Sequence, residues 1–190
     1  MRRLVVRVAA LLAVPLAGCG GGGTSGVDAP EPTAASAGIT VTSPAFEQNG
    51  PIPAQYTCHG PGISPALRWS GVPADARALA LVVDDPDAPH GTYTHWVVVD
   101  VPTSTDHVDA GSTPSGGTEL TASGGAGWSP PCPPSGTHHY RFHVYALRTE
   151  LGLPSDTSIA RAMRAIGAHT VSWGLLTGTV TASGGDSGGY

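Results

Sequence analysis

The stretch Tyr140–Leu147, with the sequence Tyr-Arg-Phe-His-Val-Tyr-Ala-Leu, limits the possible folds of this chain more than any other feature. Its residues alternate so that Tyr140, Phe142, Val144 and Ala146 share one face, as they do in a half-buried β-strand. Alternation, β-branched residues or continuous apolar character favour four more strands, at residues 39–42, 78–83, 96–101 and 175–181. This pattern predicts a mainly β chain.

Helical periodicity occurs in one place. Ser155 or Asp156 can cap a helix that Gly167 can end, and apolar residues recur within it at helical spacing: Ile159, Ala162, Met163 and Ile166. The Gly/Ser/Thr-rich stretch 103–127 predicts a long loop, and the 27 glycines and 18 prolines favour short strands joined by turns. We therefore expect one domain, residues 38–182, folded as a mainly antiparallel β-sandwich with little helix.

The N-terminus has the character of an export signal. Arg2, Arg3 and Arg7 precede an apolar run, Val8–Ala17, that is much shorter than the roughly 20 residues needed to cross a bilayer. A positive start followed by a short apolar run is typical of a secretory signal peptide. The run ends in Leu16-Ala17-Gly18-Cys19, which resembles the bacterial lipobox. That resemblance implies removal of residues 1–18 and acylation of Cys19, as in palmitate-carrying lipoproteins.

The next residues favour a tether. Residues 19–37 are rich in Gly, Ser, Thr, Pro and Ala, which predicts a flexible linker, and residues 183–190 predict a flexible Gly/Ser tail. Acyl chains hold a protein at a membrane surface without a spanning helix. We therefore expect the mature chain in the cell envelope, lipid-anchored on the outer face of the cytoplasmic membrane. An ordinary signal peptide that carries a Cys is the alternative.

Export also bears on the remaining cysteines. With Cys19 acylated, Cys58 and Cys132 form an even pair in an oxidising compartment. A disulfide between them would close a long loop and contribute about 4 kcal/mol in the chain-entropy model. Two free thiols, or half of a metal site, are the alternatives, and the lack of a CxxC motif disfavours the metal site. We favour the disulfide.

The charge balance argues against a nucleic-acid partner. Lysine is absent, and loss of Arg2, Arg3 and Arg7 with the signal leaves 9 − 3 = 6 basic residues against 14 acidic ones, a formal charge of 6 − 14 = −8. Proteins that bind nucleic acids need a basic stripe that releases counterions. No such stripe remains.

Acidic residues crowd the end of one predicted strand. The sequence Asp84-Asp85-Pro86-Asp87-Ala88-Pro89 follows the apolar run 78–83, and carboxylates at such a place are costly unless they are solvated or used. Pro86 and Pro89 stiffen the backbone, which holds the Asp85 carboxylate in a fixed direction. A plain acidic turn is the alternative.

Histidines open two further strands. On strand parity His95 shares a face with Val97 and Val99, so that an imidazole stands at the end of an apolar row. His138 shares its parity with Tyr140, and it follows the proline-rich stretch Pro130-Pro131-Cys132-Pro133-Pro134. Most lone histidines of this kind are structural. Together with the acidic stretch, however, they predict a binding site.

A collinear set of motifs identifies a family resemblance. From Ile39 to Thr181 the chain resembles the bacterial, Raf-kinase-inhibitor-like branch of the phosphatidylethanolamine-binding family. The matching residues are Phe46, Ile52-Pro53, Tyr56-Thr57-Cys58, Ile63-Ser64-Pro65, Leu67, Trp69, Val72-Pro73, Asp85-Pro86-Asp87-Ala88-Pro89, His95-Trp96-Val97-Val98, Cys132-Pro133-Pro134, His138, Tyr140, Tyr145-Ala146-Leu147, His169 and Leu176-Thr177-Gly178-Thr179.

The resemblance implies a Greek-key β-sandwich of two antiparallel sheets with one or two short C-terminal helices. It also implies a pocket for phosphate-like or carboxylate anions, such as a phospholipid headgroup, formed by Asp85, His95, His138, Tyr140, Tyr93, Pro133 and Pro134. No cofactor is implied. The chain departs from the family pattern along one rim, at Thr121-Ala122-Ser123-Gly124, Trp128, Pro130 and His139, and these changes bear on ligand preference.

The residues favour a binding protein over an enzyme. An anion can bind beside Asp85 only if positive charge outweighs that carboxylate, so with histidine pKa values of about 6.5 we expect phosphate affinity to rise as the pH falls from 8 to 6. The alternatives are an inhibitor of a protease or kinase, with a protease favoured outside the cell, and a metal-dependent hydrolase. The second would use Asp85, His95 and His138, although no HExxH motif is present.

A serine-protease motif occurs at the C-terminus, Gly185-Asp186-Ser187-Gly188-Gly189. A nucleophile there would need a histidine base, an orienting acid and an oxyanion hole, and proteases continue beyond the motif to build a specificity pocket. Only Tyr190 follows here, so we expect a tail and not a nucleophile.

Overall fold

The computed structural model describes residues 26–32, 35–122 and 125–183. It contains one α-helix, α1 (Ile159–His169), and one short 3-10 helix, η1 (Ala54–Tyr56). The strands are β1 (Thr40–Thr42), β2 (Gly50–Pro51), β3 (Leu67–Ser70), β4 (Ala78–Asp85), β5 (Tyr93–Val101), β6 (His107–Val108), β7 (Thr118–Glu119), β8 (Thr121–Ala122), β9 (Gly125–Ala126), β10 (Thr137–Leu147) and β11 (Thr170–Thr181).

The strands form one large sheet and two small ones. The large sheet has the order β2-β11-β10-β4-β5-β7, and all its pairs are antiparallel except β2 with β11. A three-stranded sheet has the order β1-β3-β6, and β8 pairs with β9. The long strand β10 runs through the centre, as its clean alternation predicts.

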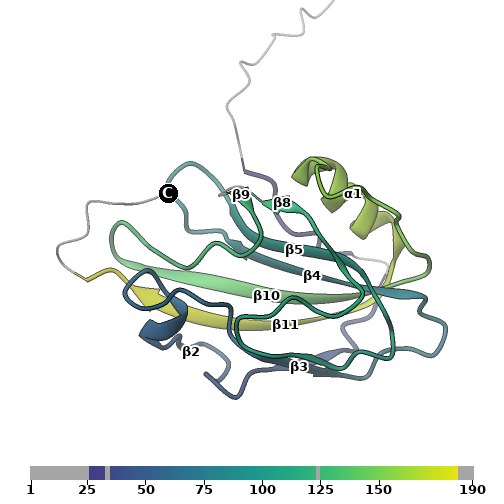
Figure 1. Ribbon diagram of the computed structural model, residues 1–190, viewed down its shortest axis with the longest axis horizontal. Helices are drawn as coiled ribbons and strands as arrows, with labels where there is room; N and C mark the ends of the chain where they lie inside the picture. Colours follow the sequence, from purple (N-terminus) through teal and green to yellow (C-terminus); the bar gives the residue numbers. More distant parts are fainter. Residues whose placement is uncertain (1–25, 33–34, 123–124, 184–190) are drawn as a thin grey trace, which may run out of the picture.

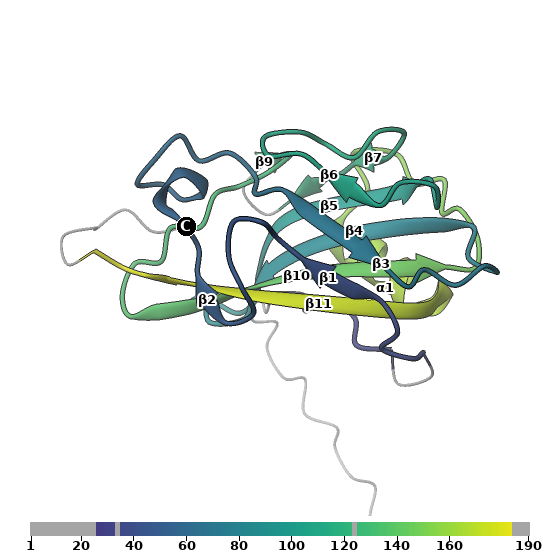
Figure 2. The ribbon, with the colours of Figure 1, turned by 90° about the horizontal axis from the view of Figure 1, so that it is seen from below.

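The large sheet buries both of its faces. On one face the three-stranded sheet covers a core built around Phe46, Trp69, Trp96 and Phe142, and Figure 2 shows β1, β3 and β6 in front of the larger sheet. On the other face α1 buries Ala162, Met163 and Ile166, and Figure 1 shows this helix above the sheet. Since β4 is covered on both sides, it reads as a continuous apolar run and not as an alternating one.

This architecture confirms the predicted mainly β fold class with one or two short helices, and it corrects several local boundaries. The helix begins at Ile159 after Ser158, later than Ser155 or Asp156, and it continues through Gly167 to His169. The stretch 103–127, expected as one long loop, contains strand segments of two residues each, β6 to β9. Segments so short carry too little periodic pattern to be recognised in the sequence.

The predicted flexible linker needs a larger correction. Residues 26–32 lie against the outer face of the large sheet, with Ala29 buried and Val27 packed against the apolar cluster beneath α1. The domain therefore includes residues upstream of Gly38. Residues 1–18, with the predicted signal peptide, Cys19 and residues 184–190, with the serine-protease motif, lie outside the described residues.

Membrane-spanning helices are not found in the part of the chain that the structure describes, because none of its helices combines sufficient length with sufficient apolar content.

Candidate functional site

Asp85 and His138 meet at one end of the large sheet. Asp85 is the last residue of β4, and His138 is the second residue of the neighbouring strand β10. The His138 Nδ1 atom lies 2.7 Å from Asp85 Oδ2, and the two side chains are 7% and 0% exposed. A carboxylate can only accept hydrogen bonds, so Nδ1 of His138 is the donor. The other oxygen, Oδ1, accepts a bond of 2.8 Å from the backbone N–H of Asp87, which fixes the carboxylate in the turn.

The turn is fastened to β10 a second time. Asp87 Oδ2 accepts hydrogen bonds of 2.8 Å from both the backbone N–H and the Nδ1 atom of His139. Asp85 and Asp87 thus hold consecutive histidines that face opposite sides of β10. These bonds fix the acidic turn relative to the two histidines. The carboxylates of Asp85 and Asp87 are therefore hydrogen-bonded to β10 and do not form a plain solvated turn.

A β-bulge directs His95 into the same region. The pairing of β4 with β5 shifts between Val83 and Asp84, because Val83 faces Trp96 while Asp84 faces Thr94. His95 is the extra residue of the bulge. It therefore turns towards Tyr140 and Trp128, with ring centroids 5.2 and 6.4 Å away. The prediction that His95 shares a face with Val97 and Val99 is wrong, since those valines belong to the cluster beneath α1.

His95 is held from one side by a backbone group and from others by aromatic rings. Its Nδ1 atom lies 2.7 Å from the carbonyl oxygen of Ser129, so Nδ1 carries the proton and donates it. Tyr93 packs edge-on at a centroid distance of 4.8 Å, and its hydroxyl lies 3.5 Å from Ser129 Oγ. The partially exposed Tyr93 ring therefore stands between the buried imidazole and solvent.

Burial makes His95 a neutral group. Loss of hydration lowers the pKa of His95 to about 4, although the bond to Ser129 and the charge of Asp85 act in the opposite direction. The sequence-based expectation that both imidazoles gain protons between pH 8 and pH 6 therefore does not hold for His95.

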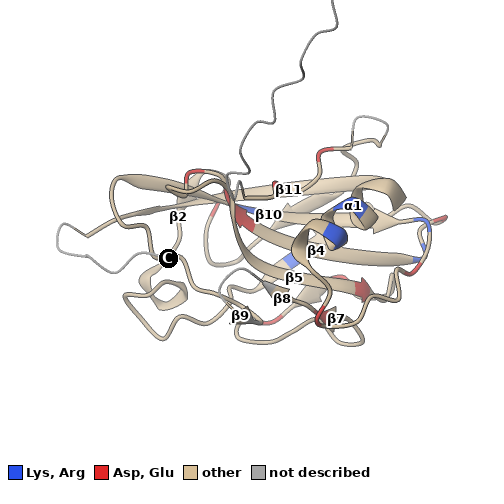
Figure 3. Ribbon diagram, turned by 90° about the horizontal axis from the view of Figure 1, so that it is seen from above, with Lys and Arg blue, Asp and Glu red and all other residues tan. Residues whose placement is uncertain are grey.

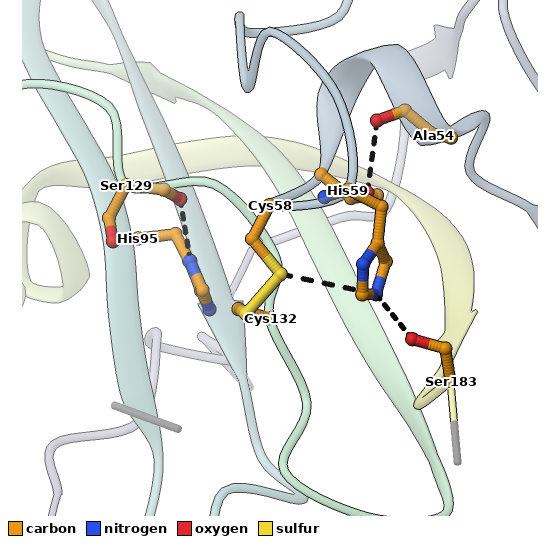
Figure 4. Close-up of a disulfide and its surroundings, with 8 residues drawn as sticks. Ala54, Cys58, His59, His95, Ser129, Cys132 and Ser183 are labelled. Atoms are coloured by element: carbon orange, nitrogen blue, oxygen red, sulfur yellow. Dashed lines mark hydrogen bonds between the residues drawn. A yellow bond between two sulfur atoms is a disulfide. The ribbon is translucent and has the colours of Figure 1, made fainter. Parts of the chain in front are cut away.

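A disulfide stabilises the wall next to His95. Cys58 and Cys132 are bridged, with their Cα atoms 5.4 Å apart, and Cys58 also donates its backbone N–H to Pro131 at 3.0 Å. Figure 4 shows the bridge beside His95 and Ser129, with His59 on its other side. The structure thus contains the bridge that we favoured over free thiols or half of a metal site.

The structure brings together most of the predicted site residues. Asp85, His95, His138 and Tyr140 are buried side by side, with Tyr93 at their edge. Pro133, buried, and Pro134, partly exposed, directly follow the bridged Cys132 in the wall segment.

Two participants were missed by sequence reasoning. The Ser129 carbonyl acts through its backbone, which leaves no signature in side-chain chemistry. Trp128 was noted only as a departure from the family pattern, yet its ring lies close to His95 and its Nε1 atom donates to the Gly62 carbonyl at 3.0 Å. An aromatic residue next to a proline-rich stretch was the only available signal.

The described residues include no group of three His, Cys, Asp or Glu side chains arranged to hold a metal ion. Asp85, His95 and His138 are not among such a group. What the cluster offers is a buried acid, a histidine bonded to that acid, and a neutral histidine enclosed by aromatic rings.

Comparisons with known proteins establish the family of this chain. The family model described as "Phosphatidylethanolamine-binding protein" matches residues 42–181, which include every predicted pocket residue. This chain belongs to the phosphatidylethanolamine-binding protein family. The sequence resemblance and the predicted fold are thereby confirmed.

Several relatives show which branches of the family the chain is similar to. It is 42% identical over 183 residues to a Mycobacterium tuberculosis protein named "Putative lipoprotein LppC", covering 88% of this chain and 90% of that one. It is 43% identical over 140 residues to a "UPF0098 protein" of Methanothermobacter thermautotrophicus, covering 70% of this chain and 93% of that one.

Two crystal structures of family members share the fold. Escherichia coli YbcL, described as a member of the mammalian PEBP family, superposes with a TM-score of 0.73 at 30% identity and covers 77% of this chain and 100% of its own. The homologue CT736 of Chlamydia trachomatis also gives 0.73, at 33% identity, and covers 78% of this chain and 100% of its own.

Proposed function

We propose that this protein is a non-catalytic binding protein that takes a small anion, such as a phosphate ester or a carboxylate, beside Asp85, His95 and His138. The hydrogen bond between Asp85 and His138 carries this proposal. It fixes the ring of His138 with Nδ1 as a donor, so protonation adds a second, charge-assisted donor at Nε2. The positive charge of the protonated ring then offsets the charge of Asp85, which would otherwise repel an anion.

His95 is proposed to supply shape and polarity without charge. Its lowered pKa keeps the imidazole neutral above pH 6. Tyr93 and Tyr140 enclose it, so that a ligand would meet aromatic faces on this side and a charged pair on the other. Such a combination favours an anionic group with an adjoining apolar or neutral part.

Two observations support binding over catalysis. Both histidines use Nδ1 to hold their own orientation, one against Asp85 and the other against the Ser129 carbonyl. The cysteines nearest the site are joined in a disulfide and offer no thiolate nucleophile.

The proposed location is the cell envelope, with the mature chain anchored to the outer face of the cytoplasmic membrane through acyl groups on Cys19. The lipobox-like sequence at Leu16–Cys19 and the similarity to a protein named as a lipoprotein support it. Figure 3 shows few basic positions, among them the arginines of α1, and this scatter supports the exclusion of nucleic acid as a partner.

The test is a titration with inorganic phosphate and with phosphoethanolamine at pH 8 and pH 6, followed by NMR. We expect the resonances of His138 and Tyr93 to shift on titration, with affinity several-fold higher at pH 6. A His138→Gln variant should lose the pH dependence. Equal affinity at the two pH values in the unmodified protein, or no shift at all, contradicts the proposal.

A further inference from the structure

The segment 26–32 is bound to the large sheet by specific polar contacts. The backbone N–H of Ala29 donates to Asp84 Oδ2 at 3.0 Å, and the Tyr145 hydroxyl donates to the Pro30 carbonyl at 2.8 Å. Ala29 is only 4% exposed. A segment that buries a side chain and satisfies its backbone groups through distant strands is a bound peptide and not a loose linker.

The anchor for this segment is a buried ion pair on the face of the sheet opposite the candidate site. Arg141 donates from Nε and Nη2 to the two oxygens of Asp84, both at 2.8 Å, and the Asp84 side chain is fully buried. Burial acts to raise the pKa of Asp84, but contacts with His143 and Arg141 outweigh it and lower the pKa to about 2. The acceptor for Ala29 therefore stays ionised at the pH of any bacterial envelope.

The upstream end of the segment lies against Thr92, beside the edge of the candidate site. The Thr92 hydroxyl donates to Asp28 Oδ1, and Gly26 approaches the Thr92 backbone so closely that a Cβ at this position would collide with its carbonyl oxygen. Thr92 immediately precedes Tyr93, the aromatic residue at the edge of the site. The described segment therefore begins next to the residue that forms the edge of the candidate site.

Docking of residues 26–32 reduces the length of chain between the folded domain and Cys19. Gly26 is seven residues after Cys19, so the Cα atoms of the two residues are at most roughly 25 Å apart. If the whole stretch to Gly38 were free, the limit would be roughly 65 Å. The loop next to Gly26 is therefore confined to a thin layer above any membrane to which Cys19 is fixed.

We propose that residues 26–32 form a strap that docks on Asp84, Arg141 and Tyr145 and holds the Tyr93 edge of the candidate site close to the membrane surface. This inference rests on the proposed acylation of Cys19. It specifies the source of the anionic ligand as the headgroup layer of the supporting membrane, since the strap presents the site to that layer. A free anion reaching the site from solution is the competing source.

The strap itself is tested by hydrogen exchange on the full chain, purified with its lipid from a bacterium that acylates lipoproteins. We expect the amide of Ala29 to exchange at least about tenfold more slowly than in an unstructured peptide. Ala29→Arg places a long charged side chain where no space exists and should remove this protection. The matched control is Ala74→Arg, the same change at an exposed turn position, which should leave it intact.

The orientation is tested by energy transfer from a fluorescent amino acid to labelled lipids in phosphatidylcholine vesicles. A donor at position 90 lies in the loop beside Thr92, whereas a donor at position 77 lies at the other end of β4, roughly 25 Å away along eight residues. We expect clearly stronger transfer from position 90. In Ala29→Arg the transfer efficiencies from positions 77 and 90 should become similar, whereas in Ala74→Arg they should remain different.

The source of the ligand is tested in the same vesicles. Phosphatidylethanolamine in the vesicles should compete with soluble phosphate for the site. We expect it to lower the apparent phosphate affinity several-fold more in the unmodified protein than in Ala29→Arg. Equal competition in the two proteins assigns the ligand to solution and overturns the inference.

Each remaining outcome is decisive. Unprotected exchange at Ala29, equal transfer from positions 77 and 90, or a mass without acyl groups on Cys19 overturns the strap or its role. If Ala29→Arg fails to fold, Tyr145→Phe removes only the hydroxyl that holds Pro30 and should give the same changes at smaller size. Exchange and energy transfer involve no anion, so they stand apart from a failure of the phosphate titration.

Discussion

His138 donates from Nδ1 to Asp85 Oδ2 over 2.7 Å, and this bond fixes the orientation of the imidazole against a buried carboxylate. With His138 neutral, the pair carries the charge of the carboxylate alone. With His138 protonated, the pair is neutral overall and presents a charge-assisted donor. Under the proposed function, an anion would bind the second of these two forms.

The first prediction concerns Asp85→Asn. The amide keeps the size of the side chain but removes the negative charge that would stabilise a positive imidazole in the proposed anion-binding form. We expect phosphate affinity at pH 6 to fall about tenfold, which corresponds to about 1.4 kcal/mol. At pH 8 the variant should bind no worse than the unmodified protein. Calorimetric titration at both pH values measures this, and a loss of equal size at the two would show that Asp85 acts through geometry alone.

The second prediction separates the two histidines. Because burial lowers the pKa of His95 to about 4, its protonation contributes nothing between pH 6 and pH 8. His95→Gln should therefore weaken phosphate binding by the same factor at both pH values, while His138→Gln should flatten the profile. If His95→Gln abolishes the pH dependence and His138→Gln retains it, the assignment of the titrating group is reversed.

Strand parity predicted the orientation of one of these histidines correctly and that of the other incorrectly. Parity placed His138 correctly with Tyr140, because β10 keeps an uninterrupted period of two up to that end of the strand. The same rule failed for His95, since a bulge inserts one residue into β5 opposite Asp84. A bulge depends on how two strands pair, so the sequence pattern of either strand alone does not predict it.

The strap was misjudged for a related reason. Its small and polar residues match the composition of a linker, and nothing local distinguishes Ala29 from Ala34, Ala35 and Ala37 further downstream in the predicted linker. What orders it is the Asp84–Arg141 pair, whose members come from two strands 57 positions apart in sequence. The strands themselves were predictable because their apolar residues make a continuous or alternating pattern. A segment held by distant partners has no such pattern of its own.

The third prediction concerns the disulfide. Cys58 and Cys132 are separated by 74 positions, and a loop of that length contributes about 4 kcal/mol to stability in the chain-entropy model. The double variant Cys58→Ala, Cys132→Ala should lose about 2–4 kcal/mol of unfolding free energy in urea. Reduction of the unmodified protein is the control and should reproduce most of the loss. Equal midpoints for oxidised and reduced protein would mean that packing of the wall, and not the bridge, holds it in place.

The fourth prediction concerns acid stability and follows from Asp84. Burial acts to raise its pKa, but contacts with His143 and Arg141 prevail and lower it from 3.8 to about 2. A group with a lowered pKa stabilises the folded state above its unfolded pKa and loses that contribution as the pH falls towards its folded value. Asp84 should therefore contribute about 2 kcal/mol at pH 6, and this contribution should disappear progressively between about pH 5 and pH 2.

The measurement for this last prediction is urea unfolding at a series of pH values for the unmodified protein and for Asp84→Asn. The variant should be less stable at pH 6 by about 3–5 kcal/mol, because it leaves Arg141 without its buried partner. Its stability should also fall less steeply below pH 5, since the group responsible for that slope is gone. Asp75→Asn, a change at an exposed turn position, is the matched control and should leave the acid slope unchanged. Parallel curves for the unmodified protein and Asp84→Asn would place the acid sensitivity elsewhere and remove the argument that the strap rests on a permanently ionised carboxylate.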